Sequence, residues 1–259
     1  METQTDGLNR NDLVALIAGL DQAELSYEAL TWVRKVSGPV YGVDSRDECS
    51  TFKSLCKTYK YGPRFALKTL RTNATKLEAN DIKHLPLSRF VSEQLFEECR
   101  GRINFIVELC DELFRAVQPA QDYCNKQAAV YYLIVKGHAL WDLASWVDHR
   151  EYLTLKPAII DVFKEGLQIA ESLGEGLALA AMMVNSYTTF LQEECGEAKE
   201  AVRIARASFD KSIERIETLD ETEYKDVTLQ LSLQRDNITL WSSEMEEQDD
   251  AANGDKSAD

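Results

Sequence analysis

The chain has 259 residues, of which 44% are apolar and 28% are charged, the balance of an ordinary globular protein. Its 12 glycines and 5 prolines are few for a β-sandwich or barrel, which needs a turn roughly every 8–12 residues. The formal net charge of −15 opposes binding to nucleic-acid phosphates and to anionic membrane surfaces, because both require a basic face. We therefore expect an all-α protein that binds neither.

The amino-terminal segment indicates a cytoplasmic protein. Residues 1–9 are polar, and we expect them to be disordered. The first twelve residues lack the basic stretch and apolar run of a signal peptide. The longest apolar run, residues 128–135, is far shorter than the ~20 residues that span a bilayer.

The first half of the chain predicts three long helical segments. Apolar residues recur at three–four spacing over residues 12–36, and a Ser-Gly-Pro sequence ends that helix. The next helix begins near residue 45 and continues to about 77. Pro63 interrupts it, because proline lacks a donor and clashes with the carbonyl of Tyr59, so we expect a kink or a restart there. After a loop at 80–87, a helix opened by Ser88 or Ser92 ends before Pro119.

The second half predicts five helices and a tail. Residues 122–147 are apolar almost all round, as in a buried helix. Pro157 suits the first turn of a helix that ends near 173, and helices follow at 175–194 and 197–218. Asp220 and Glu223 form a capping-box pattern at the start of the last helix. Residues 244–259 hold seven acidic residues, and we expect a disordered acidic tail. The prediction is a single domain at 10–243, a bundle of about nine antiparallel helices.

Three segments carry a family resemblance. The sequence YKDVTLQLSLQRDNITLW at residues 224–241 closely resembles the carboxy-terminal signature of the 14-3-3 family. Residues 205–219 resemble the family's preceding helix, and YYLIVKG at 131–137 resembles its fifth helix. The resemblance is strongest over 200–243 and weakest before Pro119. It implies a nine-helix, usually dimeric, cup-shaped adaptor whose groove holds phosphoserine or phosphothreonine peptides of partner proteins.

The last helix presents two faces that carry apolar residues. One face, with a four-residue repeat, consists of Leu229, Leu233, Asn237 and Trp241, and the other of Val227, Leu231 and Ile238. Periodicity alone leaves open whether both faces belong to the core. The resemblance implies that the first face lines the peptide groove and that its asparagine bonds the peptide backbone.

A second groove asparagine is implied by the resemblance at Asn185, which follows Val184. An amide suits an extended peptide because it supplies both a donor and an acceptor. Two glutamines depart from the family pattern: Gln230 replaces an apolar groove residue, and Gln192 replaces a glutamate.

The phosphate site implied by the resemblance is only partly present. The family uses a lysine and an arginine seven positions apart, which Lys57 and Arg64 match, although both could equally be solvated surface cations. The resemblance implies that Lys136 lies in the peptide groove. Counting from Lys136, the family's Arg-Tyr pair falls on Trp141 and Asp142, which are thereby also implied to line the groove. One phosphate cation is thus lost and a carboxylate is added, a change that typically costs ~2–5 kcal/mol. We expect weakened or altered phosphate recognition.

The residue inventory favours a protein without catalytic activity. The three histidines (His84, His138 and His149) stand in unrelated contexts, and no nucleophile is paired with a base. The six cysteines contain no CxxC pair, and we read them as small core residues in a reducing compartment. We expect neither a metal nor a cofactor.

Three functions remain open at this point. The first is a divergent 14-3-3 adaptor for phosphorylated proteins. The second is the same fold used as a phosphate-independent scaffold, or as the heterodimer partner of another 14-3-3 subunit. The third is a tetratricopeptide-type scaffold, but no 34-residue repeat is apparent. The resemblance also implies a dimer formed through the helix of residues 12–36, where Gly19 and Leu25 take the place of an apolar contact and a salt-bridge arginine.

Overall fold

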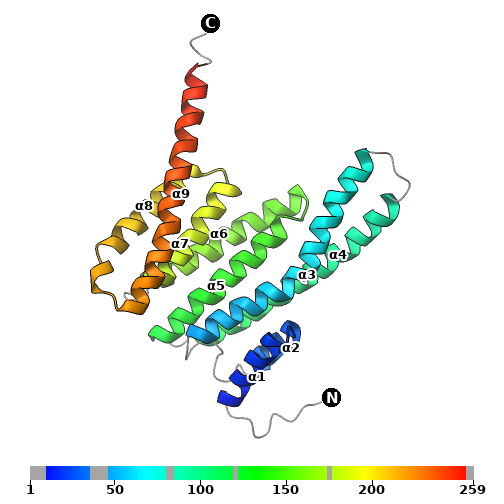
Figure 1. Cartoon of the computed structure of the whole chain (residues 1–259), viewed down its shortest axis with the longest axis horizontal. Helices are drawn as coiled ribbons and strands as arrows, with labels where there is room; N and C mark the ends of the chain where they lie inside the picture. Colours follow the sequence, from blue (N-terminus) through cyan, green and yellow to red (C-terminus); the bar gives the residue numbers. More distant parts are fainter. Residues whose placement is uncertain (1–9, 36–45, 80–84, 119–121, 174–176, 255–259) are drawn as a thin grey trace. The chain divides into compact units, whose positions relative to one another are not determined.

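The computed structural model describes residues 10–35, 46–79, 85–118, 122–173 and 177–254 (Figure 1). These residues form helices and their connections, without a strand, which confirms the predicted all-α class. The elements are α1 (Arg10–Gln22), α2 (Ser26–Lys35), α3 (Arg46–Ala79), α4 (Leu85–Val117), α5 (Tyr123–Ala144), α6 (His149–Glu171), α7 (Leu177–Glu193), α8 (Ala198–Ile213), the 3-10 helix η1 (Ile216–Thr218) and α9 (Glu221–Gly254). Within these ranges, no helix has an apolar stretch that could cross a membrane.

Two compact units divide the chain, where the sequence predicted one domain at 10–243. The first ends at Pro157 and contains α1–α5 with the start of α6. The second begins at Ala158 and contains the rest of α6 with α7–α9. Each unit has buried apolar residues of its own, so each is described separately below.

The first unit is built on α3, α4 and α5, which pack along one another, while α1 and α2 pack against α3. Its core contains Phe52 of α3, Leu109 of α4 and Tyr132 of α5, all fully buried. The Phe52 and Tyr132 rings meet edge to face, with centroids 5.6 Å apart. Every residue from 128 to 135 is buried, which confirms the prediction of an all-round buried helix.

The second unit consists of mutually packed α7, α8 and α9, together with the later part of α6. Val227 and Leu231 of α9 are buried against Leu177 and Ala178 of α7. Phe163 of α6 lies with its ring centroid 6.0 Å from that of Phe190 on α7. The buried face of α9 is therefore the one marked by Val227 and Leu231.

The predicted helix at 12–36 is in fact two helices. α1 ends at Gln22 and α2 begins at Ser26, and Glu24 between them has a φ of 60°. The Leu25 amide donates to the Leu20 carbonyl (2.9 Å), and the Glu24 amide donates to the Asp21 carbonyl (3.0 Å). These two bonds form a Schellman motif, which normally has glycine at the left-handed position. The sequence contains no local signal for this break, because Glu24 stands at the left-handed position and glutamate is a good helix former.

Pro63 does not end the second predicted segment. α3 continues from Arg46 to Ala79, and Figure 1 shows it as one continuous ribbon that bends along its length. The Tyr59 carbonyl, deprived of its usual amide by Pro63, accepts instead from Arg102 Nη1 of α4 at 2.7 Å. The guanidinium also lies 4.9 Å from the centroid of the Tyr59 ring. A side chain from the neighbouring helix thus stabilises the interrupted turn.

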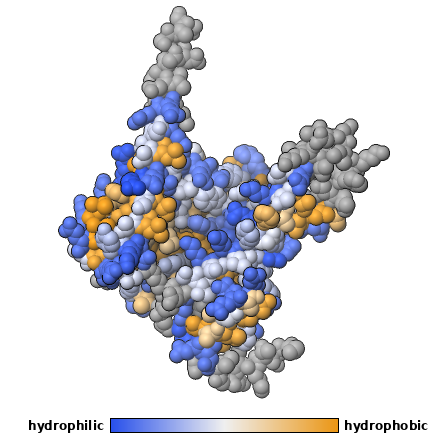
Figure 2. Space-filling model, viewed as in Figure 1, coloured by the Kyte–Doolittle hydropathy of each residue, from blue (hydrophilic) through white to orange (hydrophobic). Residues whose placement is uncertain are grey.

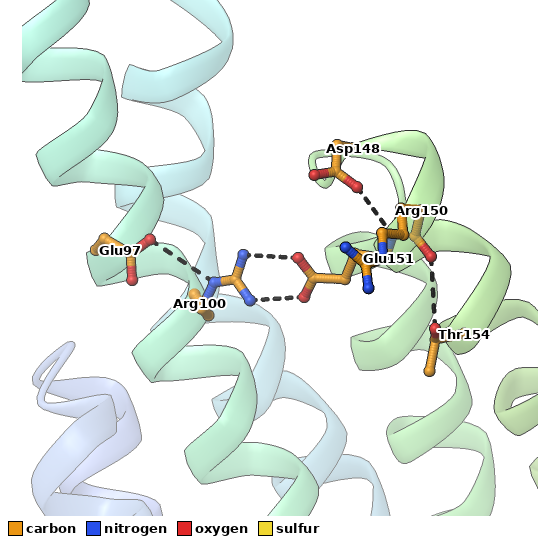
Figure 3. Close-up of polar contacts among 6 residues, drawn as sticks. All are labelled: Glu97, Arg100, Asp148, Arg150, Glu151 and Thr154. Atoms are coloured by element: carbon orange, nitrogen blue, oxygen red, sulfur yellow. Dashed lines mark hydrogen bonds and ion pairs between the residues drawn. The ribbon is translucent and has the colours of Figure 1, made fainter.

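α6 begins at His149, so the prediction that Pro157 lies in its first turn is wrong. The Asp148 carboxylate accepts from the Glu151 amide at 2.9 Å and caps the helix. The Glu151 carboxylate accepts hydrogen bonds from both terminal nitrogens of Arg100 on α4, at 2.6 and 3.0 Å (Figure 3). This forked ion pair and the cap place the first turn eight residues before the proline.

The predicted start of α9 is confirmed, but its end is not where the sequence placed it. Asp220 Oδ1 accepts from the amides of Thr222 (2.8 Å) and Glu223 (2.9 Å). The helix then continues to Gly254, through residues predicted to be a disordered tail from 244 onward. No proline or glycine interrupts 244–253, and glutamate, glutamine, methionine and alanine favour helix. The remaining tail residues 255–259, and the predicted disordered segment 1–9, lie outside the described residues.

Candidate functional site

In the first unit, basic side chains form a row along α3. Lys53, Lys57, Lys60 and Arg64 follow one another at spacings of four, three and four, so they share one face of the helix. Lys57 and Arg64 were predicted from the sequence as phosphate-binding cations, whereas Lys60 was not. Partial desolvation and the nearby charge of Lys57 lower the pKa of Lys53. Cations concentrated in this way suit an anionic ligand.

Asp142 of α5 faces this row and compensates part of its charge. Its carboxylate forms an ion pair with Lys60 and lies 3.0 Å from Arg64 Nη2. The Asp142 and Lys60 side chains are each only 14% exposed, whereas Arg64 is 48% exposed. The Asp142 carboxylate therefore contacts one of the two predicted phosphate cations, and it also contacts Lys60.

His138 and Trp141 lie beside this ion-pair cluster. The two rings meet edge to face, with centroids 6.1 Å apart, and Trp141 is partly exposed. Burial, followed by the charges of Lys60 and Lys53, lowers the pKa of His138 to about 4. The imidazole is therefore neutral at pH 7 and adds no cation to the row.

Lys136 belongs to a different contact of α5. Its ammonium lies 2.5 Å from Asp111 Oδ1 on α4, and this ion pair joins the two helices. The structure thus places Lys136 in helix packing within the first unit. Its predicted part in a peptide groove remains a prediction.

In the second unit, the α9 face marked by Leu229 and Leu233 is exposed. Leu229 is 61% exposed and Leu233 48%, whereas Val227 and Leu231 are buried. Figure 2 shows apolar surface gathered over α9. At these four positions the second face belongs to the core and the first face does not.

The other predicted positions on α7 and α9 are less uniform. Asn237 is partly exposed, but Trp241 at the end of the same row is only 5% exposed and contributes to the core. Val184 is buried and lines a cavity between α6, α7 and α8. Gln192 Nε2 donates to Glu244 Oε2 at 3.2 Å, which ties α7 to the later part of α9.

Asn185 makes an unexpected contact with Gln230. Its Nδ2 donates to the Gln230 backbone carbonyl (3.1 Å) and to the Gln230 Oε1 (3.0 Å). The Asn185 Oδ1 is buried and has no hydrogen-bond partner among the described residues. The amide donor is therefore occupied within the second unit, while the acceptor is buried and unsatisfied.

The described residues contain no group of three or more His, Cys, Asp or Glu side chains arranged to hold a metal. Four of the six cysteines are buried, which confirms the core interpretation for them, whereas Cys124 is exposed and Cys195 is partly exposed. Burial raises the pKa of Cys49 to about 12 and raises that of Cys56 further. These two thiols are protonated at neutral pH and poor nucleophiles.

Comparison with known proteins shows similarity along nearly the whole chain. The model of a family described as "14-3-3 protein" matches residues 17–242. The 14-3-3 protein theta of Homo sapiens is 27% identical over 256 residues, covering 95% of this chain and 99% of that protein. The 14-3-3-like protein GF14 omega of Arabidopsis thaliana is 28% identical over 253 residues, covering 96% and 95%. The 14-3-3 protein beta/alpha-1 of Oncorhynchus mykiss is 26% identical over 255 residues, covering 95% and 99%. The similarity includes the region before Pro119, where the resemblance of the sequence is weakest.

Proposed function

Because this chain belongs to the 14-3-3 family, we propose that it is a regulatory adaptor that binds phosphoserine or phosphothreonine segments of partner proteins. The observation that carries the proposal is the basic row of α3. Lys57, Lys60 and Arg64 present three cations on one helical face, and guanidinium and ammonium groups are the usual ligands of phosphate. The exposed leucines of α9 supply apolar surface of the kind that contacts the ligand's side chains.

Phosphate recognition in this chain is altered by Asp142. The carboxylate already contacts Lys60 and Arg64, so an incoming phosphate must compete with it for the same cations. A dianion beside a carboxylate also experiences like-charge repulsion. Lys60 supplies one positive charge in place of the family arginine. The negative charge of Asp142, which pairs with Lys60, cancels this contribution. We therefore infer weaker phosphate binding than three free cations would provide.

The Asn185–Gln230 contact acts in the same direction in the second unit. A peptide carbonyl that needs the Asn185 Nδ2 donor must displace two hydrogen bonds. The Oδ1 acceptor is buried, so a peptide N–H reaches it only if the Asn185 side chain reorients. The donor that would hold a peptide is thus engaged within the protein before the peptide arrives.

A phosphate-independent scaffold, or a heterodimer partner of another 14-3-3 subunit, is the second candidate. Charge compensation by Asp142 specifically favours it, because a partly compensated row gives less preference for a phosphorylated ligand. The two candidates differ in one measurable quantity, which is the ratio of affinities for a phosphorylated and an unphosphorylated peptide.

The test is a fluorescence-anisotropy titration of a phosphoserine peptide and its unphosphorylated twin. The adaptor function predicts tighter binding of the phosphopeptide, and a loss of roughly tenfold or more in Arg64→Gln and Lys57→Gln. Arg150→Gln is the matched control, since Arg150 is an exposed cation at the start of α6 (Figure 3). Equal affinity for the two peptides in the unmodified protein would reject the adaptor and support the scaffold.

A further inference from the structure

A cavity of about 340 Å³ lies in the second unit between α6, α7 and α8. Leu167 and Ala170 of α6, Ala180 and Val184 of α7, and Ile204 and Ala207 of α8 line it. Three of these six are alanines, one from each helix, and larger side chains at those positions would occupy the space. Pockets that hold small molecules have volumes of roughly 300–1,000 Å³ and mostly apolar walls, so this cavity is large enough for one.

One wall of the cavity presents a hydroxyl group with unused hydrogen-bonding capacity. Ser208 of α8 lines the cavity, and its Oγ accepts from Gln234 Nε2 of α9 at 3.2 Å. Gln234 is fully buried, and its Oε1 has no partner among the described residues. The Ser208 hydroxyl still has its own proton to donate, because a hydroxyl accepts and donates at once.

The cations that line the cavity give it a charge opposite to that of the whole chain. Arg203, Lys211 and Arg215 are among its lining residues, and Glu171 is the one carboxylate in that lining. Glu200 compensates Arg203 through an ion pair of 2.6 Å, which leaves Lys211 and Arg215 to attract an anion. In a protein of net charge −15, two cations beside an apolar cavity form a local anion-attracting site.

We propose that this cavity binds a small amphipathic carboxylate, with an apolar body between the three helices and its carboxylate at Lys211 and Arg215. The body contacts the alanines of the three helices, and the Ser208 hydroxyl donates to a polar atom of the ligand. The site is separate from the basic row on α3 and does not depend on phosphopeptide binding. It would make the second unit responsive to a small molecule as well as to a protein partner.

Isothermal titration with decanoate, kept below its micelle concentration, tests the proposal on the full chain. We expect saturable binding at one site, and at least tenfold weaker binding of decanol, which has the same body without the charge. Ala207→Leu, which fills the cavity, and Arg215→Gln, which removes a cation, should each weaken decanoate binding at least tenfold. Leu233→Ser probes the competing apolar surface on the exposed face of α9 and should leave decanoate binding unchanged.

Two results would overturn the assignment. If Ala207→Leu binds decanoate like the unmodified protein, the ligand does not occupy the cavity. If Leu233→Ser abolishes binding, the ligand lies on the exposed face of α9. Ala180→Leu fills the same space from α7, so it replaces Ala207→Leu should that variant melt early.

Discussion

Among single residues, Asp142 has the largest expected effect on ligand binding. Replacing Trp141 by Arg and Asp142 by Tyr restores the family pair and removes the carboxylate from Lys60 and Arg64. We expect phosphopeptide affinity to rise at least tenfold, and the gain to vanish for the unphosphorylated peptide because the added contact is with the phosphate. Asp142→Asn alone separates charge removal from the new arginine. Anisotropy titrations of the three proteins with the two peptides give the six affinities.

The prediction for this pair has a clear contrary outcome. Nanomolar phosphopeptide binding by the unmodified protein would mean that Lys57, Lys60 and Arg64 suffice despite the carboxylate. An early melt of the double variant would mean that the new guanidinium is buried without a partner, which costs several kcal/mol. The partial exposure of Trp141 argues against such a melt.

His138 makes the stability of the folded state depend on pH. Its folded pKa is about 4, lowered by burial and by Lys60 and Lys53, with Asp142 acting weakly in the opposite direction. The unfolded imidazole takes up a proton below pH ~6.5 and the folded one does not, so stability is lost as pH falls from about 6.5 towards 4. At pH 5 the loss should be about 2 kcal/mol.

Urea unfolding at pH 7 and pH 5 measures this loss. His138→Gln should lose about 2 kcal/mol less free energy of unfolding between the two pH values than the unmodified protein. His149→Gln removes an exposed imidazole at the start of α6 and serves as the control. An unchanged difference in the His138 variant would show that the imidazole is accessible to protons in the folded protein.

Glu24 is the residue whose backbone is least suited to its side chain. A non-glycine residue with φ near 60° costs of order 1 kcal/mol relative to glycine. Glu24→Gly should therefore raise the free energy of unfolding by about 1 kcal/mol, whereas Ala23→Gly beside it should not. Thermal melts of the two variants decide this, and destabilisation by Glu24→Gly would contradict it.

At the level of elements, α3 and α4 are joined where Pro63 interrupts the backbone bonds. Arg102→Ala leaves the Tyr59 carbonyl without its 2.7 Å donor, which should cost about 1–3 kcal/mol. In a Pro63→Ala background the amide of residue 63 can bond Tyr59, so the cost of Arg102→Ala should fall by about 1 kcal/mol. A double-mutant cycle in urea measures the difference. Equal costs in both backgrounds would show that the guanidinium does not replace the missing amide.

Local signals predicted the elements well, and long-range contacts account for most of the differences. The apolar pattern of α5 and the Asp220 cap are local, and both were confirmed. The continuity of α3 depends on Arg102, which lies 43 residues from Tyr59, and no local pattern reveals it. In the same way, the first turn of α6 is held by Arg100, 51 residues before Glu151.

The candidate site shows the same division between local and distant contacts. Lys60 could have been found from its three-residue spacing to Lys57, since helical spacing alone places it on the same face. Its pairing with Asp142 could not, because that contact joins two helices far apart in sequence. The donation from Asn185 to Gln230 likewise joins α7 to α9, so the sequence indicated the substitution at position 230 but not its consequence.

For the whole molecule, we propose a dimer formed through α1 and α2, as a homodimer or with another 14-3-3 subunit. Leu25 is 44% exposed and Tyr27 50% exposed, and the position of Gly19 on α1 has open space around it. The large negative charge of the chain opposes association in general, so a dimer requires apolar surface that two copies can bury.

Light scattering at micromolar concentration should therefore give about twice the 29.3 kDa of one chain. Leu25→Glu with Tyr27→Glu places four carboxylates across a two-fold interface, where like charges cost several kcal/mol, and should shift the mass to that of one chain. Leu240→Glu with Tyr224→Glu is the matched control, because these residues are 55% and 47% exposed on α9 and their substitution adds the same two charges elsewhere. A mass of 29.3 kDa for the unmodified protein would exclude the homodimer. Co-purification with an affinity-tagged second 14-3-3 chain, and its loss in the variant with Leu25→Glu and Tyr27→Glu, would then show whether the same face forms a heterodimer.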